Sequence, residues 1–229
     1  MTVLSGVLSV FSLILLSGGW DSSVIQRQDV SLRDVSRMKQ HNVKADFGEY
    51  RGRKALRVTD QTARRSGLVD SMVILPEPVF QDGVIELELS GETGPNAGPQ
   101  ARGFVGIAFH VVDDGKRFEC FYLRPTNGRA DDQVRRNHSA QYISHPDYPW
   151  ERLRKEFPEK YESYVDLVPG EWTKVRVEVN GSKARLFVHG ASQPTLIVND
   201  LKMGETRGAI ALWIGPGTVA HFTDLRVSR

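Results

Sequence analysis

The stretch FVGIAFHVVDDGKRFECFYLR, residues 104–124, decides the fold class of this chain. Two apolar runs lie on either side of the turn Asp113-Asp114-Gly115. An Asp-Gly turn between two apolar runs is a strong signal for a β-hairpin, because both residues tolerate the backbone angles of tight turns. The same pattern recurs at 172–188, where Asn180-Gly181 separates two further runs. The sequence therefore predicts at least two hairpins.

Outward from these hairpins, the chain continues as short apolar runs separated by turns, with no helical period of comparable length. Many short strands with turn signals between them are typical of an all-β sandwich. No low-complexity linker divides the chain, so we expect a single two-sheet antiparallel sandwich domain over 20–229. Further strands are predicted at 42–50, 55–58, 68–75, 84–89, 196–198, 209–214 and 220–227, and a loop at 91–103.

The composition is that of an ordinary globular protein. The chain has 229 residues, of which 40% are hydrophobic and 25% charged, and its formal net charge is +2. Nucleic-acid-binding proteins gather basic residues on one face, whereas acidic and basic residues are interspersed here, so we expect no nucleic-acid partner. The single cysteine, Cys120, can form neither an internal disulfide nor a zinc cluster, and its apolar neighbours predict a buried thiol.

The first residues resemble a secretory leader. Val3–Leu16 is apolar, and Ser17-Gly18-Gly19 supplies the small residues that a signal peptidase requires. The apolar run is shorter than the roughly 20 residues of a membrane-spanning helix. We therefore expect a signal peptide over 1–19, a secreted or periplasmic protein, and no stable membrane anchor. A buried N-terminal strand is the alternative.

A long insert, 125–166, separates two predicted strands. It is dense in His, Arg, Tyr, Trp and Pro, and a loop of this length in a compact domain is usually functional. We expect one short helix in it, capped by Asp147, starting near Trp150 and ended by Pro158. Its apolar face would pack onto the sheet.

Alternation along the strands separates an inward face from an outward face. If the runs at 84–89, 106–111, 118–124 and 210–214 share one sheet, its outward face carries Glu86, Glu88, His110, Tyr122, Arg124 and Trp213. Aromatic rings with carboxylates and a guanidinium suit a saccharide, whose C–H faces stack on rings and whose hydroxyls accept and donate hydrogen bonds. Small residues between them would leave room for a groove. Alternatively, the two glutamates only solvate an outer face.

Glu86 and Glu88 lie two residues apart, so their Cα atoms would be roughly 7 Å apart on a strand. Paired carboxylates about 5–5.5 Å apart suit retaining glycosidases, and wider pairs suit inverting ones. The pair is thus compatible with glycoside hydrolysis.

Five segments resemble the concanavalin A-like lectin/glucanase superfamily, and within it the 3-keto-disaccharide hydrolase-type, LamG-like domains. They are QDGVIE (81–86), GIAF (106–109), GEWT (170–173), GAIALW (208–213) and FTDL (222–225). The resemblance implies a jelly-roll whose concave sheet binds a glycan. It also implies an elimination at a 3-keto sugar, with His110 or Glu88 as the base and Arg124 stabilising the enolate.

We therefore expect an exported carbohydrate-active domain, either a glycoside hydrolase or lyase. A lectin-like binding module and a structural or protein-interaction sandwich are the alternatives. His138, His145 and their neighbouring aspartates lack the tight spacing of a metal site, so no metal or other cofactor is predicted. The expected catalytic residues are Glu86, Glu88 and His110, and the expected substrate contacts are Tyr122, Arg124, Asn127, Tyr142, His145, Trp150 and Trp213.

Overall fold

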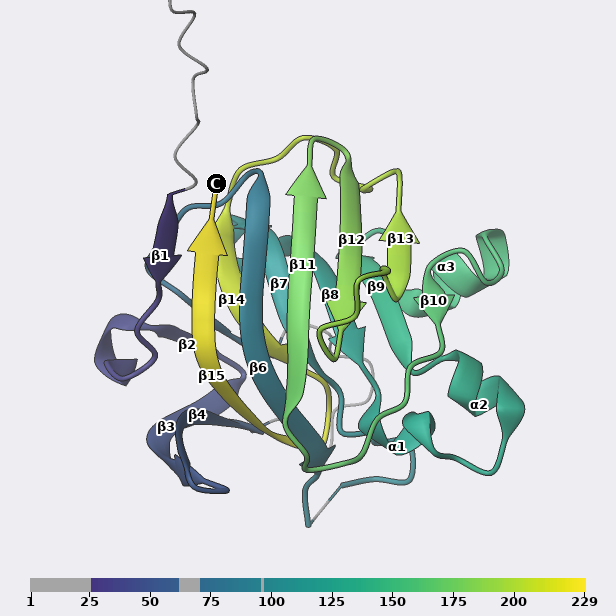
Figure 1. Ribbon diagram of the computed structural model, residues 1–229, viewed down its shortest axis with the longest axis horizontal. Helices are drawn as coiled ribbons and strands as arrows, with labels where there is room; N and C mark the ends of the chain where they lie inside the picture. Colours follow the sequence, from purple (N-terminus) through teal and green to yellow (C-terminus); the bar gives the residue numbers. More distant parts are fainter. Residues whose placement is uncertain (1–25, 62–70, 96) are drawn as a thin grey trace, which may run out of the picture.

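The computed structural model describes residues 26–61, 71–95 and 97–229, and the structural statements below concern these residues. They form two antiparallel β-sheets packed face to face, with short helices gathered at one edge (Figure 1). The predicted leader, 1–19, lies outside the described residues.

The strands are β1 (Arg27–Asp29), β2 (Lys39–His41), β3 (Val43–Tyr50), β4 (Arg53–Asp60), β5 (Met72–Ile74), β6 (Gly83–Thr93), β7 (Val105–Val112), β8 (Arg117–Leu123), β9 (Ala140–His145), β10 (Glu162–Ser163), β11 (Thr173–Asn180), β12 (Lys183–Val188), β13 (Leu196–Val198), β14 (Ala209–Ile214) and β15 (Thr218–Ser228). The helices are α1 (Pro125–Gly128), α2 (Gln133–Asn137) and α3 (Trp150–Glu156).

Sheet A has the strand order β13-β12-β11-β6-β15-β4-β3, and β1 pairs with the end of β15. Sheet B has the order β10-β9-β8-β7-β14-β5-β2. In Figure 1 sheet A faces the viewer and sheet B lies behind it. The chain thus crosses between the sheets several times, as in a jelly roll, and the predicted two-sheet antiparallel sandwich is confirmed.

The core lies between the sheets and follows the predicted alternation. The inward side chains named below are at most 3% exposed, and each contributes about 1.5–3 kcal/mol when fully buried. From sheet A they include Ile85, Leu87 and Leu89, and from sheet B Ile107, Phe109, Ile210, Leu212 and Ile214. Cys120 is fully buried, as predicted, and burial raises the pKa of its thiol well above the usual value.

The hairpin that decided the fold class is formed by β7 and β8. Its turn, Asp113-Asp114-Gly115, has φ angles of 51°, 59° and 93°, which Asp and Gly adopt more readily than other residues. The pairing register shifts between Phe109 and Val112, and His110 within this bulge has φ 53°. The bulge interrupts the alternation of inward and outward side chains along β7, from which His110 was predicted to lie on the outward face.

The insert does not form a loop beside the sheet. It contains α1, α2, β9, α3 and β10, and β9 pairs with β8 from Phe118↔His145 to Leu123↔Ala140. The expectation of one short helix in a long loop is therefore wrong, because two strands of the insert extend sheet B at its edge. Figure 1 shows α2 and α3 beyond that edge and α1 below the end of β8.

Helix α3 is the predicted helix. Its Leu153 side chain is fully buried against the sheet. Trp150, which begins the helix, and Phe157, which follows it, are half-buried against the core. The expected cap is wrong: Pro149 occupies the N-cap position without a side-chain hydrogen bond, and Asp147 instead accepts a hydrogen bond from the Arg152 guanidinium at its backbone oxygen, at 2.8 Å.

Two further features differ from the sequence prediction. Strand β6 runs on to Thr93, which pairs with Thr218, so the loop predicted at 91–103 begins later. The short edge strands β1 and β2 were not predicted. No helix within the described ranges is long and apolar enough to cross a membrane.

Gly106 gives a test of the packing of sheet B. A Cβ atom there would overlap the backbone oxygen of Phe121 and lie 2.6 Å from the Tyr122 Cβ. We expect Gly106→Ala to lower the free energy of unfolding by about 1–3 kcal/mol, as overpacked substitutions do. Gly48→Ala is the matched control, since nothing lies within 4 Å of its Cβ position. Urea unfolding of both variants measures the difference, and equal stabilities would contradict the packing described.

Candidate functional site

The two predicted glutamates lie on a different sheet from the other predicted residues. Glu86 and Glu88 belong to β6 in sheet A, whereas Tyr122 and Trp213 belong to β8 and β14 in sheet B. The assumption that all these strands share one sheet is therefore wrong. The local alternation was correct, but alternation cannot show which sheet a strand joins.

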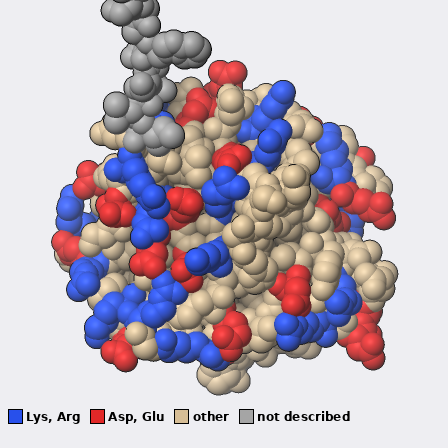
Figure 2. All heavy atoms as spheres, viewed as in Figure 1, with Lys and Arg blue, Asp and Glu red and all other residues tan. Residues whose placement is uncertain are grey.

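The outward face of sheet A is highly charged. Figure 2 shows basic and acidic side chains interspersed over β1, β15 and β6, with an area free of charge towards β13, below the exposed Lys183 and Arg185 of β12. Two shallow hollows lie on this face, with volumes of about 620 and 460 Å³, and both are lined in part by Asp224 and Arg226. Glu86 and Glu88 line the smaller hollow, together with Phe187.

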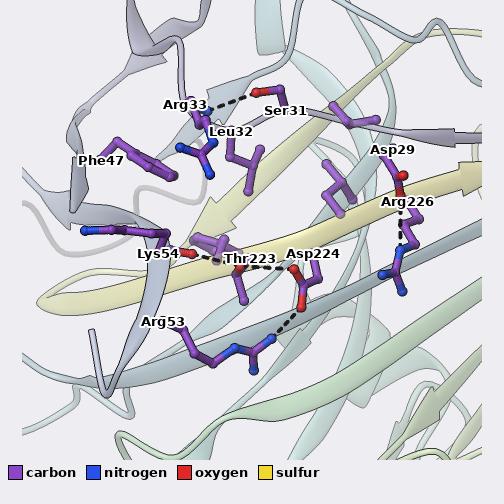
Figure 3. A pocket seen from close by; sticks show the side chains of 13 residues that line it. Asp29, Ser31, Leu32, Arg33, Phe47, Arg53, Lys54, Thr223, Asp224 and Arg226 are labelled. Atoms are coloured by element: carbon purple, nitrogen blue, oxygen red, sulfur yellow. Dashed lines mark hydrogen bonds and ion pairs between the residues drawn. The ribbon is translucent and has the colours of Figure 1, made fainter. Parts of the chain in front are cut away.

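The carboxylates of this face are held in ion pairs. Glu88 accepts from Arg53 at 2.7 Å, and Arg53 also binds Asp224 (Figure 3). Glu86 pairs with Arg27 at 3.3 Å. Pairs of this kind near the surface contribute about 0–1 kcal/mol each to stability. The hollow therefore has charge of both signs, with its predicted catalytic carboxylates already bound to guanidinium groups.

A stacked pair lies beside the hollows on the same face. The rings of Tyr50 and His221 are parallel, with centroids 3.5 Å apart, and the Tyr50 hydroxyl donates to the Gly170 carbonyl oxygen at 2.8 Å. His221 is buried, and this burial, together with the positive charge of Arg57, lowers the pKa of His221 to about 4. The charged imidazolium is thus unfavourable in the folded protein.

Sheet B carries most of the predicted ligand contacts. In the pairing register, Trp213 lies beside Gly106, Gly106 beside Tyr122, and Tyr122 beside Gln141. Because Gly106 has no side chain, the rings of Tyr122 and Trp213 approach to 4.8 Å between centroids. Both rings are at most 3% exposed. They form the floor of this part of the face.

Arg124 lies above this floor. Its guanidinium donates to the Tyr122 hydroxyl at 2.9 Å, to Gln141 Oε1 at 3.1 Å and to the His138 backbone oxygen at 2.8 Å. Its Cζ atom lies 5.1 to 6.0 Å from the ring centroids of three aromatic residues, Tyr122, Trp150 and Phe104. We call Arg124, Tyr122, Phe104, Trp150 and Trp213 the arginine–aromatic cluster.

Glu162 of β10 joins this cluster to the insert. Its carboxylate accepts two hydrogen bonds from the Arg154 guanidinium, at 2.8 and 2.6 Å, and lies 3.8 Å from Arg124 and 3.6 Å from the His138 ring. Its side chain is only 3% exposed. Bidentate guanidinium–carboxylate pairs are strong and fix orientation, so Glu162 holds α3, β10 and β8 in one arrangement.

Part of this site is open to solvent. Trp150 and Phe104 are half-buried, and the Arg154 and His138 side chains are 34% and 20% exposed. Burial lowers the pKa of His138, and the two arginines add to this effect while Glu162 opposes it. The site therefore offers a flat ring, a neutral imidazole and a guanidinium to a ligand. The buried Asn127 donates to the His138 backbone oxygen at 3.2 Å and lies beneath them.

Three predicted residues lie elsewhere. His110 is fully buried, and its Nε2 donates to the Gln81 carbonyl oxygen at 2.8 Å beside Phe80, so it faces neither Arg124 nor Glu88. Burial lowers its pKa. Tyr142 is also fully buried, and its hydroxyl donates to Glu119 at 2.6 Å.

His145 is the third. It stacks on Phe118 at the end of β9 that is remote from Arg124. Five predicted residues are thus brought together: Tyr122, Arg124, Asn127, Trp150 and Trp213.

Sequence reasoning missed Glu162, Arg154 and Phe104. Arg154 follows Trp150 by four residues on α3, and residues with this spacing share a helix face, so this residue could have been found. Glu162 could not, because it depends on the pairing of β10 with β9. Within the described ranges, no group of three His, Cys, Asp or Glu side chains is placed to hold a metal ion.

Glu162 gives a stability test of the site. We expect Glu162→Gln to lower the free energy of unfolding by about 3 kcal/mol, because it leaves two buried or half-buried guanidinium groups without a carboxylate. Glu156→Gln is the control, since Glu156 pairs with Arg152 at 2.8 Å on the exposed side of α3 and should change stability by less than about 0.5 kcal/mol. Urea unfolding distinguishes the two, and a small effect of both would show that the buried ion pair does not hold the insert.

His221 predicts a pH dependence. Its pKa is about 4 in the folded protein and about 6.5 when unfolded, so the unfolded chain binds more protons between these values. The free energy of unfolding should therefore fall as pH decreases from about 6.5 to about 4, by at most about 3 kcal/mol. Urea unfolding across this range should give a shallower decrease for His221→Gln than for the wild type. An identical decrease in both would refute the contribution of His221.

Comparison with known proteins supports the fold. No protein-family model matches the sequence, and no curated protein is significantly similar to it. Among solved structures, a protein of unknown function with a galectin-like fold from Bacillus subtilis matches with TM-score 0.54 and 12% identity, over 86% of this chain and 91% of that one.

Two further matches have lower scores. A carbohydrate-binding module from Bacillus subtilis gives TM-score 0.48 and 12% identity, over 82% and 97% of the two chains. A β-glucanase from Bacillus licheniformis gives 0.46 and 13%, over 93% and 95%. Together with the two-sheet topology, the match to the galectin-like structure shows that this chain has a concanavalin A-like jelly-roll fold.

Proposed function

We propose that this protein is an exported carbohydrate-binding domain that holds a saccharide against the arginine–aromatic cluster of sheet B. One observation carries the proposal: the half-buried ring of Trp150 has two guanidinium groups close to it, with the Cζ atoms of Arg154 and Arg124 at 4.7 and 5.9 Å from its centroid. An aromatic plane bordered by fixed polar groups is the arrangement that sugar recognition requires, because a pyranose has an apolar C–H face and a rim of hydroxyls.

The polar groups around Trp150 are held in place before a ligand arrives. The Arg154 guanidinium donates one hydrogen bond to each carboxylate oxygen of Glu162. Arg124 donates one hydrogen bond each to the Tyr122 hydroxyl, Gln141 Oε1 and the His138 backbone oxygen. Side chains that are already ordered lose little entropy on binding, which favours affinity. Arg154 and His138 remain partly exposed and can still reach a hydroxyl.

The jelly-roll fold is compatible with this proposal but carries no activity by itself, since one fold hosts many functions. The proposed export rests on the apolar stretch Val3–Leu16 followed by small residues.

A second candidate function is glycoside cleavage on the outward face of sheet A, and one observation supports it. Glu86 and Glu88 line the 460 Å³ hollow of sheet A. In this candidate, which includes the cleavage of a 3-keto-glycoside, Glu88 is the base. Arg124 could not stabilise the enolate there, because it lies on sheet B; Arg53, which binds Glu88, is the guanidinium in reach.

A pair of tryptophans tests the location of the site. Trp150 and Trp172 are both half-buried with an arginine over the ring, Arg154 at 4.7 Å and Arg53 at 4.9 Å, but Trp172 lies on the sheet A side. We expect Trp150→Ala to weaken saccharide binding about 10-fold or more, as loss of a central aromatic contact does, and Trp172→Ala to leave it within about 2-fold.

The measurement is a glycan-array screen of the wild type, followed by titration calorimetry of both variants with the best ligand, after circular dichroism has shown that they are folded. Loss of binding in Trp172→Ala alone would place the site on sheet A. Release of reducing sugar, abolished by Glu88→Gln, would establish the second candidate. No binding to any glycan would overturn the proposal.

A further inference from the structure

Three side chains lie in one row across the outward face of sheet A. Ser90 of β6 pairs with His221 of β15, and residues directly opposite in an antiparallel pair point to the same face. The pairing of β11 with β6 places Thr173 opposite Leu89, and continued by one residue it places Trp172 opposite Ser90. Since Leu89 faces the core, Ser90 and its two neighbours face outward. The row is therefore Trp172, Ser90 and His221, in that order.

Each member of this row has a buried polar atom that makes no hydrogen bond. Among the residues that the structure describes, Ser90 Oγ, His221 Nδ1 and Trp172 Nε1 have no partner. Ser90 and His221 are only 2% and 6% exposed. Nearly all buried polar groups in proteins are paired, because an unpaired group has lost its contact with water and gained nothing in return. A ligand that reaches the row can therefore gain hydrogen bonds without breaking any that the row already makes.

The ring of Tyr50 covers the middle of the row. It lies parallel to the His221 ring, with centroids 3.5 Å apart, and meets the Trp172 ring edge-on, with centroids 5.6 Å apart. Because these two rings stand on either side of Ser90, Tyr50 lies over the serine and keeps solvent from its hydroxyl. We call the space between Trp172 and His221, with Ser90 at its floor, the Tyr50 slot.

Tyr50 fills this slot but pairs with none of its three polar atoms. The Tyr50 hydroxyl donates instead to the Gly170 carbonyl oxygen at 2.8 Å and lies 3.5 Å from Glu92 Oε1. A phenol has one polar group, whereas a pyranose has an apolar C–H face and hydroxyls around its rim. Hydroxyls both donate and accept, so they suit the indole N–H, the serine hydroxyl and either tautomer of the imidazole. A sugar ring thus matches the walls of the slot better than the tyrosine does.

The position of Tyr50 in the fold allows its side chain to leave the slot. Tyr50 ends β3, the edge strand of sheet A, and precedes the turn Arg51-Gly52 that leads into β4. Beside it, Arg51 pairs with Glu171 at 2.7 Å, and both side chains of this pair are about half exposed. Exposed ion pairs contribute little to stability. Rotation of one side chain at this edge therefore opens the slot without breaking the pairing of the strands.

The slot borders the larger hollow of sheet A. The Arg53 Cζ atom lies 4.9 Å from the Trp172 ring centroid, and Arg53 also lines the hollow of about 620 Å³ (Figure 3). Further sugar units of a ligand whose first ring enters the slot can extend into this hollow.

We propose that sheet A holds a second saccharide site, which Tyr50 closes in the unbound protein. A sugar ring displaces the Tyr50 side chain, stacks between Trp172 and His221, and exchanges hydrogen bonds with Ser90 at the floor of the slot. This site is separate from the one proposed on sheet B and does not depend on it. In the closed state it binds weakly, because a ligand must first displace the tyrosine.

Removal of the Tyr50 ring tests the inference. Tyr50→Ala and Tyr50→Phe are each combined with Trp150→Ala, which removes the proposed site on sheet B. The probes are the methyl glycosides of glucose, galactose, mannose and xylose, titrated while the indole N–H resonance of Trp172 is followed by NMR. We expect at least one probe to shift this resonance and to bind the Tyr50→Ala protein about 10-fold or more tightly than the Tyr50→Phe protein, because affinity falls with the fraction of molecules in which a site is open.

Tyr50→Phe is the matched control, since it keeps the ring that closes the slot. Adding Ser90→Ala to Tyr50→Ala should weaken binding about 5-fold, because a hydrogen bond at the floor is lost. Ser90→Ala alone should leave urea unfolding unchanged, since its hydroxyl makes no hydrogen bond within the described residues. Tyr50→Val, with a residue that favours strands, replaces Tyr50→Ala if circular dichroism shows that the alanine variant is unfolded.

An unchanged Trp172 resonance with every probe in the folded, opened protein would overturn the inference. Equal affinities of the Tyr50→Ala and Tyr50→Phe proteins would also overturn it, because Tyr50 would then not close the site. Binding that is insensitive to Ser90→Ala would remove the slot as its location. The site on sheet B is tested separately by the effect of Trp150→Ala on glycan binding by the otherwise unchanged protein, so failure of one proposal leaves the other standing.

Discussion

The ion pair between Glu162 and Arg154 is the interaction on which the shape of the candidate site depends. Glu162 lies on the short edge strand β10, and Arg154 lies on a helix of seven residues. Neither element is long enough to be stable alone. The buried carboxylate joins them to each other and, through Arg124, to β8. Removing water from these charges is unfavourable unless every partner is present, so the arrangement forms as a unit. Trp150 takes its place beside Arg124 because α3 is fixed by this pair.

The two outward faces of the sandwich differ in how their charges are treated. On sheet A, arginines and carboxylates pair near the surface, where solvent screens them and each pair contributes little. On sheet B, Arg124 is 5% exposed, is surrounded by aromatic rings and neutral acceptors, and lies 3.8 Å from the buried Glu162 carboxylate. A charge in such surroundings responds strongly to any ligand that brings another charge or hydrogen bond. This difference favours sheet B as the face where binding is specific.

The sequence was informative wherever structure depends on near neighbours. Alternation identified Ile85, Leu87 and Leu89 as core residues, and the Asp-Gly turn identified the β7–β8 hairpin. It failed where structure depends on distant pairing. No local pattern shows that β6 joins β11 and β15 rather than β7, and this placed Glu88 on the wrong face. His110 was misplaced for a different reason: a bulge with a positive φ angle turns its side chain towards Phe80.

The small residues of sheet B have a role opposite to the one expected. Gly106 was expected to leave room for a groove across the sheet. Instead it allows Trp213 and Tyr122 to pack against each other over it, and both rings are nearly inaccessible. The centre of the face is therefore closed by its own aromatic side chains. In the proposed function, the saccharide binds at the border of this packed floor, where Trp150, His138 and Arg154 are partly exposed. Trp150 and Arg154 belong to α3, and His138 follows α2. On this proposal the sheet provides a rigid support, and the insert provides the side chains that contact the saccharide.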